Sequence, residues 1–333
     1  NCVPASKKCQ RTGQKWLMIV VEPALFAGFG ILMNELFSAS LDRRALLRGT
    51  AQAGMGLALG GILAGCGGDG DTIGGGNGGG TGLTEAQALN FALNLEYLEA
   101  EYYLIGTGRK AANDDTDGFG PGAIDGRAVE GGLGAYSDLA NEIAEDERKH
   151  VVFLRQALGG AAVNRPRISL QAAFAAAAEA AGLGTGFDVF ANATNFLLGA
   201  FAFEYVGVTA YAGAAPAIRN PAFLTAAAGI LGVEAYHAAA IRGEILRIGG
   251  DAVVAANAIS RLRGRASANN PGLGFNDPAG KDETVDKAGY NLVPTDANSV
   301  NFARTGAEVT RIVTLGGANS RGGFFPDGFV LSR

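Results

Sequence analysis

Apolar residues recur at helical spacing along most of the chain after residue 83, at positions three and four residues apart. This pattern predicts four long helices, over residues 84–108, 136–160, 188–215 and 220–250. Polar residues mark where two of them begin. Thr84 and Gln87 form a capping-box pattern, and Asn220 precedes Pro221 as an N-cap precedes the first helical residue. Four long helices of this kind are typical of a helical bundle.

The segments between the helices indicate how the bundle is connected. A polar, Gly-rich loop over 108–134 follows the first helix, and a longer crossover with a short Ala-rich helix, Ser169 to Ala181, leads to the second pair. A fifth, shorter helix begins near Asp251, and the last stretch of the chain is rich in Gly, Pro and Asn. The predicted fold class is all-α: a four-helix bundle with a long crossover and a short fifth helix over 83–268, and an irregular tail over 269–333 packed on it.

The front of the chain has a different pattern. Residues 66–82 are dominated by Gly and predict a flexible tether. Ahead of it, within 33–65, the pair Arg43 and Arg44, a short apolar run and the letters LAGC follow one another in the order that an export signal needs. This order resembles a bacterial twin-arginine signal that ends in a lipoprotein box, with Cys66 as the lipidated first residue of the mature chain. The alternative is a chance apolar stretch.

The resemblance implies an exported bacterial protein on the periplasmic side of the cell envelope, which touches the membrane only through its lipid anchor. The apolar run is too short and too rich in Gly for a convincing transmembrane helix. Residues 1–32 precede Met33, a plausible start of the charged leader. We therefore expect residues 1–32 to be upstream read-through or a leader without function.

Charge and cysteine content exclude several classes of function for the body of the chain. Residues 66–333 hold 20 Lys and Arg against 29 Asp and Glu, a net charge of −9, which argues against nucleic acid and anionic membranes as partners. Cysteine occurs only at Cys2, Cys9 and Cys66. The body therefore holds no disulfide, zinc knuckle, Fe–S ligand or cysteine nucleophile.

The residues that point to chemistry are glutamates on the apolar faces of the predicted helices. Positions i±3, i±4 and i±7 share a helical face, and around one glutamate in each long helix these positions are mostly apolar. The four are Glu96, Glu147, Glu204 and Glu234. Glu145, in contrast, shares its face with polar and charged residues. A buried carboxylate without a partner costs several kcal/mol, so four that face one core need compensation.

The only two histidines of the chain lie where they can partly compensate these buried carboxylates. His150 and His237 each follow a glutamate of this set by three residues, which places each pair on one helical face. Two Glu-x-x-His pairs and two single glutamates give six ligands, enough for two metal ions with positions left open for water or an oxygen species. The alternative is two hydrogen-bonded Glu–His pairs in a core without metal.

The same Glu-to-Tyr spacing occurs in the first and third helices. Tyr103 lies seven residues after Glu96, and Tyr211 lies seven residues after Glu204. Each hydroxyl is expected on the face of the carboxylates, within reach of a bound carboxylate or water; the alternative is an ordinary core tyrosine. Glu99 is a rival to Glu96 as a ligand, and the matching tyrosine spacing favours Glu96.

The constellation resembles the ferritin-like di-iron carboxylate superfamily, whose bundles carry one Glu on each of two helices and Glu-x-x-His on the other two. Rubrerythrins are similar in the Glu-to-Tyr spacing of EYLEAEYY and EYVGVTAY. The segments FLLGAFAFEYVGVTAYAGAAP and FARTGAEVTRIVTLGGANSRGGFFPDG resemble desiccation-related ferritin-like proteins of plants and bacteria, over residues 83–330. The resemblance implies two metal ions, with iron favoured over manganese, and six ligands: Glu96, Glu147, His150, Glu204, Glu234 and His237.

Three functions are compatible with these residues. The first is an oxidoreductase for stress defence, of peroxidase, catalase or ferroxidase type, in which the metals polarise peroxide or O₂ and Tyr103 and Tyr211 hold the site. Because the chain lacks the Cys-rich domain of a rubrerythrin, it would need an external reductant or would disproportionate its substrate. The second is a desiccation-related structural or metal-sequestering protein without turnover, and the third is a metal-free binding module. The expected partner is a small oxidant or a metal ion, and a homo-oligomer remains open.

Overall fold

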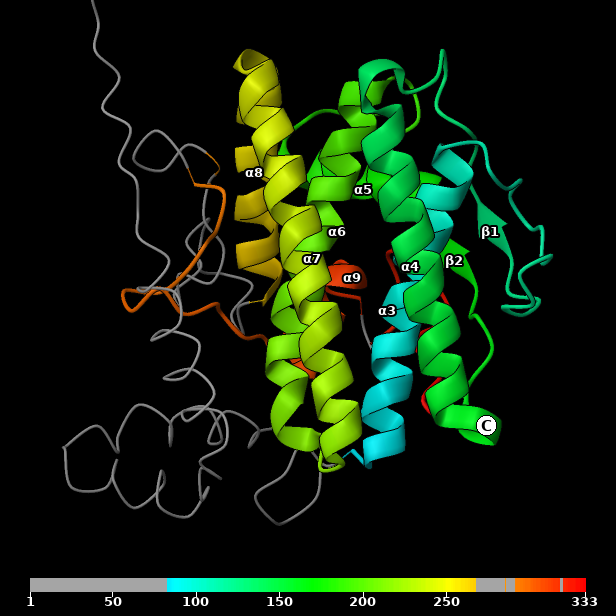
Figure 1. Ribbon diagram of the computed structural model, residues 1–333. Helices are drawn as coiled ribbons and strands as arrows, with labels where there is room; N and C mark the ends of the chain where they lie inside the picture. The colour runs from blue at the N-terminus through cyan, green and yellow to red at the C-terminus, as the bar shows by residue number, and fades with distance from the viewer. Residues whose placement is uncertain (1–82, 268–284, 286–290, 318–319) are drawn as a thin grey trace, which may run out of the picture. The chain divides into compact units, whose positions relative to one another are not determined.

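The computed structural model describes residues 83–267, 285, 291–317 and 320–333, and helices dominate this part of the chain (Figure 1). The predicted leader and tether lie outside the described residues, as does the lipidation site at Cys66. The described residues show an all-α bundle, which confirms the predicted fold class.

Four long helices form the bundle: α3 (Glu85–Gly106), α4 (Ser137–Leu158), α6 (Ala193–Ala214) and α7 (Pro221–Ile248). The predicted capping box is present at the start of α3, where the Thr84 hydroxyl accepts from Gln87 N and the Gln87 side chain accepts from Thr84 N. Asn220 caps α7 ahead of Pro221, also as predicted. The third helix begins later than the predicted residue 188, because the Asn192 side chain caps α6.

The helices pack as two pairs, α3 with α4 and α6 with α7, and α3 also packs on α6. Every residue of α3 from Ala88 to Gly106 is buried, and α6 is buried along most of its length. The other two helices have one buried and one exposed face. The centre of the bundle therefore lies between the two buried helices, with α4 and α7 covering it (Figure 1).

The loop after α3 and the crossover after α4 meet in a two-stranded parallel sheet. Strand β1 (Ile124–Asp125) pairs with β2 (Ile168–Ser169) in the register Ile124 to Ile168. The Asp125 carboxylate also accepts from the backbone N–H groups of Leu170 and Gln171, at the start of α5 (Gln171–Ala181). A residue of the long loop thus caps the crossover helix and joins the two connections. Two 3-10 turns belong to these connections, η2 (Gly134–Tyr136) and η3 (Gly159–Ala161), and η4 (Ala215–Ala217) lies between α6 and α7.

The fifth predicted helix is α8 (Gly250–Ser267), which packs on α5 and α6. The described part of the tail contains a helix, α9 (Gly306–Val313), that the sequence pattern did not predict. It begins with a capping box made by Thr305 and Glu308. The tail also bonds to the bundle directly, since Asn94 Nδ2 donates to the carbonyl of Val330 over 2.8 Å.

Two of the bundle helices are long and apolar enough to cross a membrane by length and composition: α6 with its η4 extension, and α7. This is weak evidence for a membrane span, since the core helix of a soluble protein passes the same test. Each of the two carries a buried glutamate, Glu204 on α6 and Glu234 on α7. A buried carboxylate is expensive in lipid, so the core of the bundle explains their composition better.

Candidate metal centre

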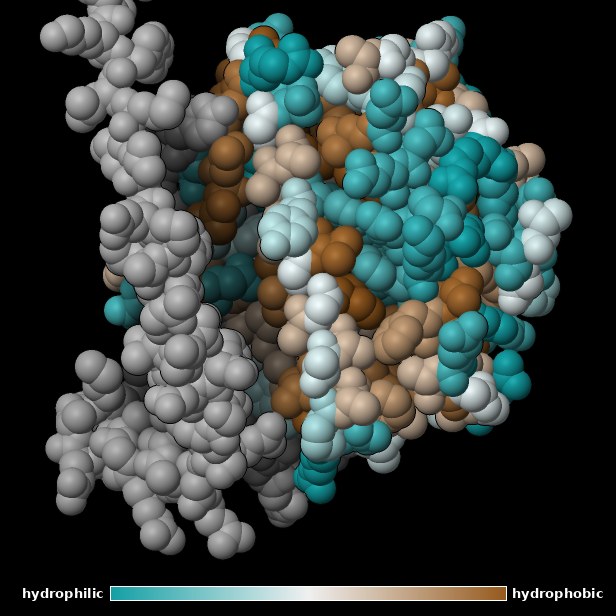
Figure 2. All heavy atoms as spheres, in the orientation of Figure 1, coloured by the Kyte–Doolittle hydropathy of each residue, from teal (hydrophilic) through white to brown (hydrophobic). Residues whose placement is uncertain are grey.

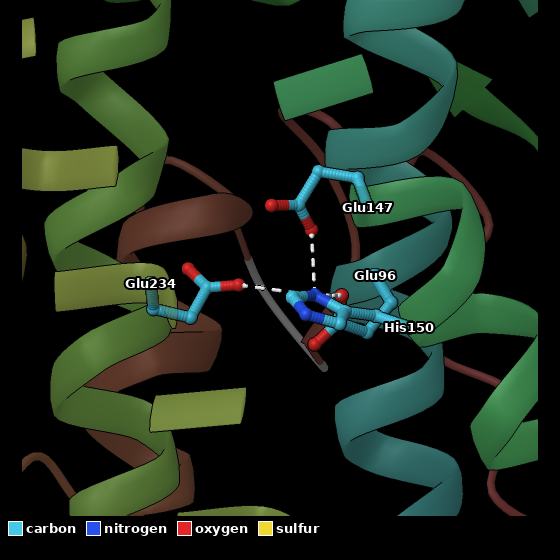
Figure 3. Close-up of side chains that lie close together, drawn as sticks. All are labelled: Glu96, Glu147, His150 and Glu234. Atoms are coloured by element: carbon cyan, nitrogen blue, oxygen red, sulfur yellow. Dashed lines mark hydrogen bonds and ion pairs between the residues drawn. The ribbon is translucent and has the colours of Figure 1, made fainter. Parts of the chain in front are cut away.

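The six predicted ligands lie together between the four bundle helices. They form two groups whose candidate ligand atoms lie within 4.8 Å of one another. The first group joins α3, α4 and α7, and the second joins α4, α6 and α7. Figure 3 shows the first group, with the Glu234 side chain reaching from α7 toward the imidazole of His150. The members of the first group are Glu96, Glu147, His150 and Glu234, and those of the second are Glu147, Glu204 and His237.

The first group converges on one nitrogen of His150. Its Nδ1 atom lies 3.2 Å from Glu96 Oε2, 3.2 Å from Glu147 Oε2 and 3.7 Å from Glu234 Oε1. The Glu-x-x-His spacing produces this contact within α4, because residues three apart lie on one helical face. The other two carboxylates reach the same nitrogen from α3 and α7. The group is therefore a product of both the local spacing and the packing of the helices.

The second group has the same construction around His237. Its Nδ1 atom lies 2.9 Å from Glu147 Oε1 and 3.4 Å from Glu204 Oε2. Glu147 consequently belongs to both groups and turns one carboxylate oxygen toward each histidine. Glu147 could therefore offer one oxygen to a metal ion held by either group.

The centre is short of hydrogen-bond donors. The four glutamates are at most 1% exposed, and five atoms of the cluster have no hydrogen-bond partner. Buried polar atoms are nearly always paired, and an unpaired one costs about 1–3 kcal/mol. Two of these atoms, Glu147 Oε1 and His237 Nδ1, lie 2.9 Å apart without forming a hydrogen bond, and the lone pairs of the five atoms converge on one region. The unpartnered atoms are Glu147 Oε1, Glu204 Oε2, both oxygens of Glu234 and His237 Nδ1.

Without metal, the carboxyl groups respond to burial in different ways. Burial raises the pKa of Glu96 to about 7, although His150 beside it acts in the opposite direction. Burial also raises the pKa of Glu234 well above its usual range, and the carboxylates around it add to the effect. Burial would raise the pKa of Glu147 too, but the adjacent imidazoles of His150 and His237 outweigh burial and lower that pKa to about 2. The metal-free centre thus keeps Glu147 ionised and favours protons on Glu96 and Glu234.

Burial and the neighbouring charges act on the pKa values of the two histidines in the opposite directions. Burial lowers the pKa of each imidazole, but the facing carboxylates outweigh burial. Glu96 and Glu147 raise the pKa of His150 to about 10, and Glu204 and Glu147 raise that of His237 to about 11. In the metal-free state, protons therefore occupy the place where cations would neutralise the carboxylates.

The two predicted tyrosines reach the carboxylates, in a crossed arrangement. The Tyr103 hydroxyl on α3 donates to Glu204 on α6, and the Tyr211 hydroxyl on α6 donates to Glu96 on α3. Each tyrosine therefore holds a carboxylate of the opposite helix rather than the one seven residues before it. Burial and the adjacent carboxylate raise the pKa of both hydroxyls well above the usual range, so both remain donors at neutral pH.

Glu99, the predicted rival of Glu96, belongs to neither group. It is buried one turn further along α3, and burial together with the neighbouring carboxylates raises its pKa well above the usual range. The ambiguity in the sequence has a structural reason. Because α3 is buried on all sides, an apolar environment does not distinguish its two faces, and only the positions of α4 and α6 select Glu96.

Two further residues shape the centre and were missed at the sequence level. The Asp146 carboxylate lies 3.4 Å from His237 Nε2 and can hold that ring nitrogen as the donor, which leaves the Nδ1 lone pair for the centre. Gly207 lies beneath Glu234, because a Cβ built on it would be 2.2 Å from Glu234 Oε2. A glycine inside an otherwise apolar helix is a usable signal, since it costs about 1 kcal/mol relative to alanine. Asp146 gives no such signal, because its contact depends on α7.

Comparison with known proteins places the chain in a family. A family model described as a ferritin-like domain matches residues 84–247. The desiccation-related protein PCC13-62 of Craterostigma plantagineum is 32% identical over 241 residues, which cover 67% of this chain and 75% of that protein. The chain belongs to the ferritin-like family. The ferritin-like catalase Nec2 of Nesocodon mauritianus is 28% identical over 270 residues, covering 74% of this chain and 84% of that protein.

The ferritin-like match contains the whole centre, from Glu96 to His237, and α9 and the tail lie beyond it. It confirms the resemblance to ferritin-like and desiccation-related proteins that the sequence indicates. No solved structure matches the chain. The buried carboxylate and histidine groups of this ferritin-like bundle could hold a metal ion.

Proposed function

We propose that the centre holds two divalent metal ions and catalyses redox chemistry on peroxide. Glu96, His150 and Glu234 would bind one ion, Glu204 and His237 the other, and Glu147 would bridge them. The observation that carries the proposal is the set of unpartnered, converging atoms at the centre. Four ionised carboxylates also carry the charge that two divalent ions balance, so the ions would remove the cost of burying them.

The donor set fits iron and manganese. Carboxylate and imidazole ligands suit both metals, and iron remains our first expectation. A bound pair of either metal would supply reversible two-electron exchange with peroxide. The chain's own residues would place and orient that pair: Tyr103 and Tyr211 fix two of the carboxylates, and Asp146 orients the His237 ring.

Peroxide disproportionation is the reaction that we favour within this class. One H₂O₂ is oxidised to O₂ and gives up two protons and two electrons, which reduce a second H₂O₂ to two molecules of water. This reaction needs no external reductant, and the relative Nec2 is named a ferritin-like catalase. Protons must be held near the centre between the two halves. Glu99, whose pKa burial and the neighbouring carboxylates raise well above the usual range, can give its proton to the peroxide that is reduced and take one back from the peroxide that is oxidised.

A second function is supported by the other relative, which is named for desiccation. In this case the centre would bind metal for structure or sequestration and would not turn over peroxide. The burial of all four glutamates fits tight metal retention as well as it fits catalysis.

Metal content and O₂ release test these functions with one pair of variants. The chain is loaded with Fe(II) or Mn(II), its metal is counted, and O₂ released from H₂O₂ is measured. We expect about two ions per chain and O₂ release for the wild type. Glu147→Gln should lose both, because Glu147 belongs to both groups.

Glu145→Gln is the matched control, since Glu145 lies on the same helix but is partly exposed and paired with Arg109 and Arg148. It should keep the metal and the activity. Full metal content in Glu147→Gln would show that the ligand assignment is wrong. Two ions without O₂ release would favour the metal-sequestering function.

A further inference from the structure

Two apolar cavities lie one behind the other on the side of the centre that α6 and α9 cover. The outer cavity lies between α5, α6, α8 and α9 and has a volume of about 50 Å³. Its lining is apolar apart from Arg263, and Leu183, Phe187 and Leu262 in that lining are only half-buried. The outer cavity therefore extends from the surface of the described chain toward the interior.

The inner cavity has a volume of about 10 Å³, room for about one small molecule, and is lined by residues of α3, α6 and α9. Phe203 and Val313 line both cavities, so these two side chains form the wall between them. Glu99 and Gly207 also line the inner cavity. Removing or moving one side chain of the wall would join the two cavities.

The inner cavity is adjacent to the candidate metal centre through one of its lining residues, Gly207. Gly207 touches the Glu234 carboxylate, because a Cβ on Gly207 would lie 2.2 Å from Glu234 Oε2. Glu99 lies one helical turn after Glu96 on α3. The outer cavity therefore leads from the surface to the inner cavity, and the inner cavity lies next to Glu234. Between the two cavities stands one wall, formed by two apolar side chains.

The lining selects for a small apolar molecule. A polar solute such as H₂O₂ would lose its hydrogen bonds to water there, which costs several kcal/mol for each unsatisfied group. Dioxygen has no such groups to desolvate, and apolar cavities of proteins accept small apolar guests. Of the molecules in the proposed reaction, O₂ is the one that this path suits.

A different face is open to polar molecules. The His150 and His237 side chains are 10% and 8% exposed, and the Asp146 carboxylate beside His237 is 33% exposed. These residues lie on α4 and α7, and Figure 2 shows hydrophilic residues gathered over α4. The polar reactant thus has an approach on the histidine side, opposite in character to the apolar cavities.

We propose that the two cavities form a path for dioxygen between the metal centre and the surface, with Phe203 and Val313 as its gate. The inference rests on the proposed function for its direction: O₂ leaves by this path during peroxide disproportionation, and it enters when the centre is reduced. Hydrogen peroxide and water use the histidine side.

Xenon and reaction rates test the path. In crystals of the full chain under xenon pressure, we expect xenon in both cavities, whether or not metal is bound. Val313→Phe should fill the wall, remove xenon from the inner cavity and slow the reaction of the Fe(II)-loaded protein with O₂ severalfold. Its reaction with H₂O₂ should stay within twofold of the wild type, and Val313→Ala should speed only the O₂ reaction.

Val254→Phe is the matched control, since Val254 is exposed on α8, and it should change none of these quantities. Absence of xenon from the inner cavity of the wild type would overturn the path even if peroxide turnover is present. Equal slowing of the O₂ and H₂O₂ reactions in Val313→Phe would also overturn it. If xenon occupies both cavities but the chain binds no metal, the path is supported and the proposed reaction is wrong.

Discussion

Glu147 is the residue on which both halves of the centre depend. Its two oxygens face the two histidines, at 3.2 Å from His150 Nδ1 and 2.9 Å from His237 Nδ1. Its counterpart on α7, Glu234, has no hydrogen-bond partner for either oxygen. The two Glu-x-x-His motifs therefore differ at the centre: Glu147 lies close to both imidazoles, whereas neither oxygen of Glu234 has a hydrogen-bond partner.

The crossed tyrosines predict a change in metal affinity without loss of the fold. Tyr103→Phe leaves Glu204 without its hydroxyl donor, and Tyr211→Phe does the same to Glu96. Because outer hydrogen bonds orient a ligand, each substitution should weaken metal binding about 10–100-fold. Competition with a chelator of known affinity measures this loss.

Tyr102→Phe provides the comparison for both tyrosines. Tyr102 is equally buried but donates to the carbonyl of Phe196 and not to a carboxylate. Its loss should lower the free energy of unfolding by about 1 kcal/mol and leave metal affinity unchanged. A matching loss of affinity in Tyr102→Phe would mean that packing, and not the carboxylate contact, sets the affinity.

At the scale of the helix, the close approach of α6 and α7 depends on Gly207. Gly207→Ala would place a Cβ 2.2 Å from Glu234 Oε2, so the carboxylate or the helix must move. We expect loss of metal from the site and a loss of about 1–3 kcal/mol of stability from overpacking. Metal content and urea unfolding measure the two effects separately.

Gly229→Ala on α7 tests whether the glycine or the contact matters. A Cβ at Gly229 meets nothing within 4 Å, and the residue is exposed. This substitution should stabilise the protein by about 1 kcal/mol, because alanine favours the helix, and should leave the metal in place. If Gly207→Ala behaved like Gly229→Ala, the contact between α6 and Glu234 would be relaxed in solution.

At the scale of the whole molecule, the bundle buries more acid than base at its centre. In the metal-free cluster, bound protons offset this excess of acid. The pKa of Glu96 is raised to about 7, that of His150 to about 10 and that of His237 to about 11. Their ordinary values are 4.5 for Glu and 6.5 for His, so the folded state binds more protons than the unfolded state between those limits. Stability must then fall as pH rises through this window.

The resulting prediction concerns the melting temperature of the metal-free and metal-loaded protein. As pH rises from about 5 to about 8, the metal-free protein should become less stable, because Glu96 and the histidines release protons when the protein unfolds. Bound ions replace those protons, so the gain in melting temperature on metal loading should increase with pH. Glu147 acts in the opposite sense, but only below pH 4.5, because its pKa is lowered to about 2.

Thermal unfolding at several pH values, with and without metal, measures this gain. Glu147→Gln should show almost no gain at any pH. A metal-free protein that becomes more stable from about pH 5 to about pH 8 would show that its folded centre binds fewer protons than these pKa values require.

The sequence by itself determined the helices, several of their caps and the set of residues that the bundle brings together. This was possible because helical faces follow from spacing alone, as with the Glu-x-x-His pairs of α4 and α7. A buried carboxylate also needs compensation wherever it occurs, so the lack of nearby basic residues pointed to cations. Both arguments depend on one helix at a time.

Only the tertiary structure decided the contacts that depend on how two helices meet. It showed that Glu147 faces both histidines, that each tyrosine holds the carboxylate of the opposite helix, and that Asp146 reaches His237. It also placed Asp125 at the start of α5, far along the chain from its own loop. Spacing along a helix gives the direction of a side chain, whereas its partner depends on the distance and crossing of the neighbouring helix.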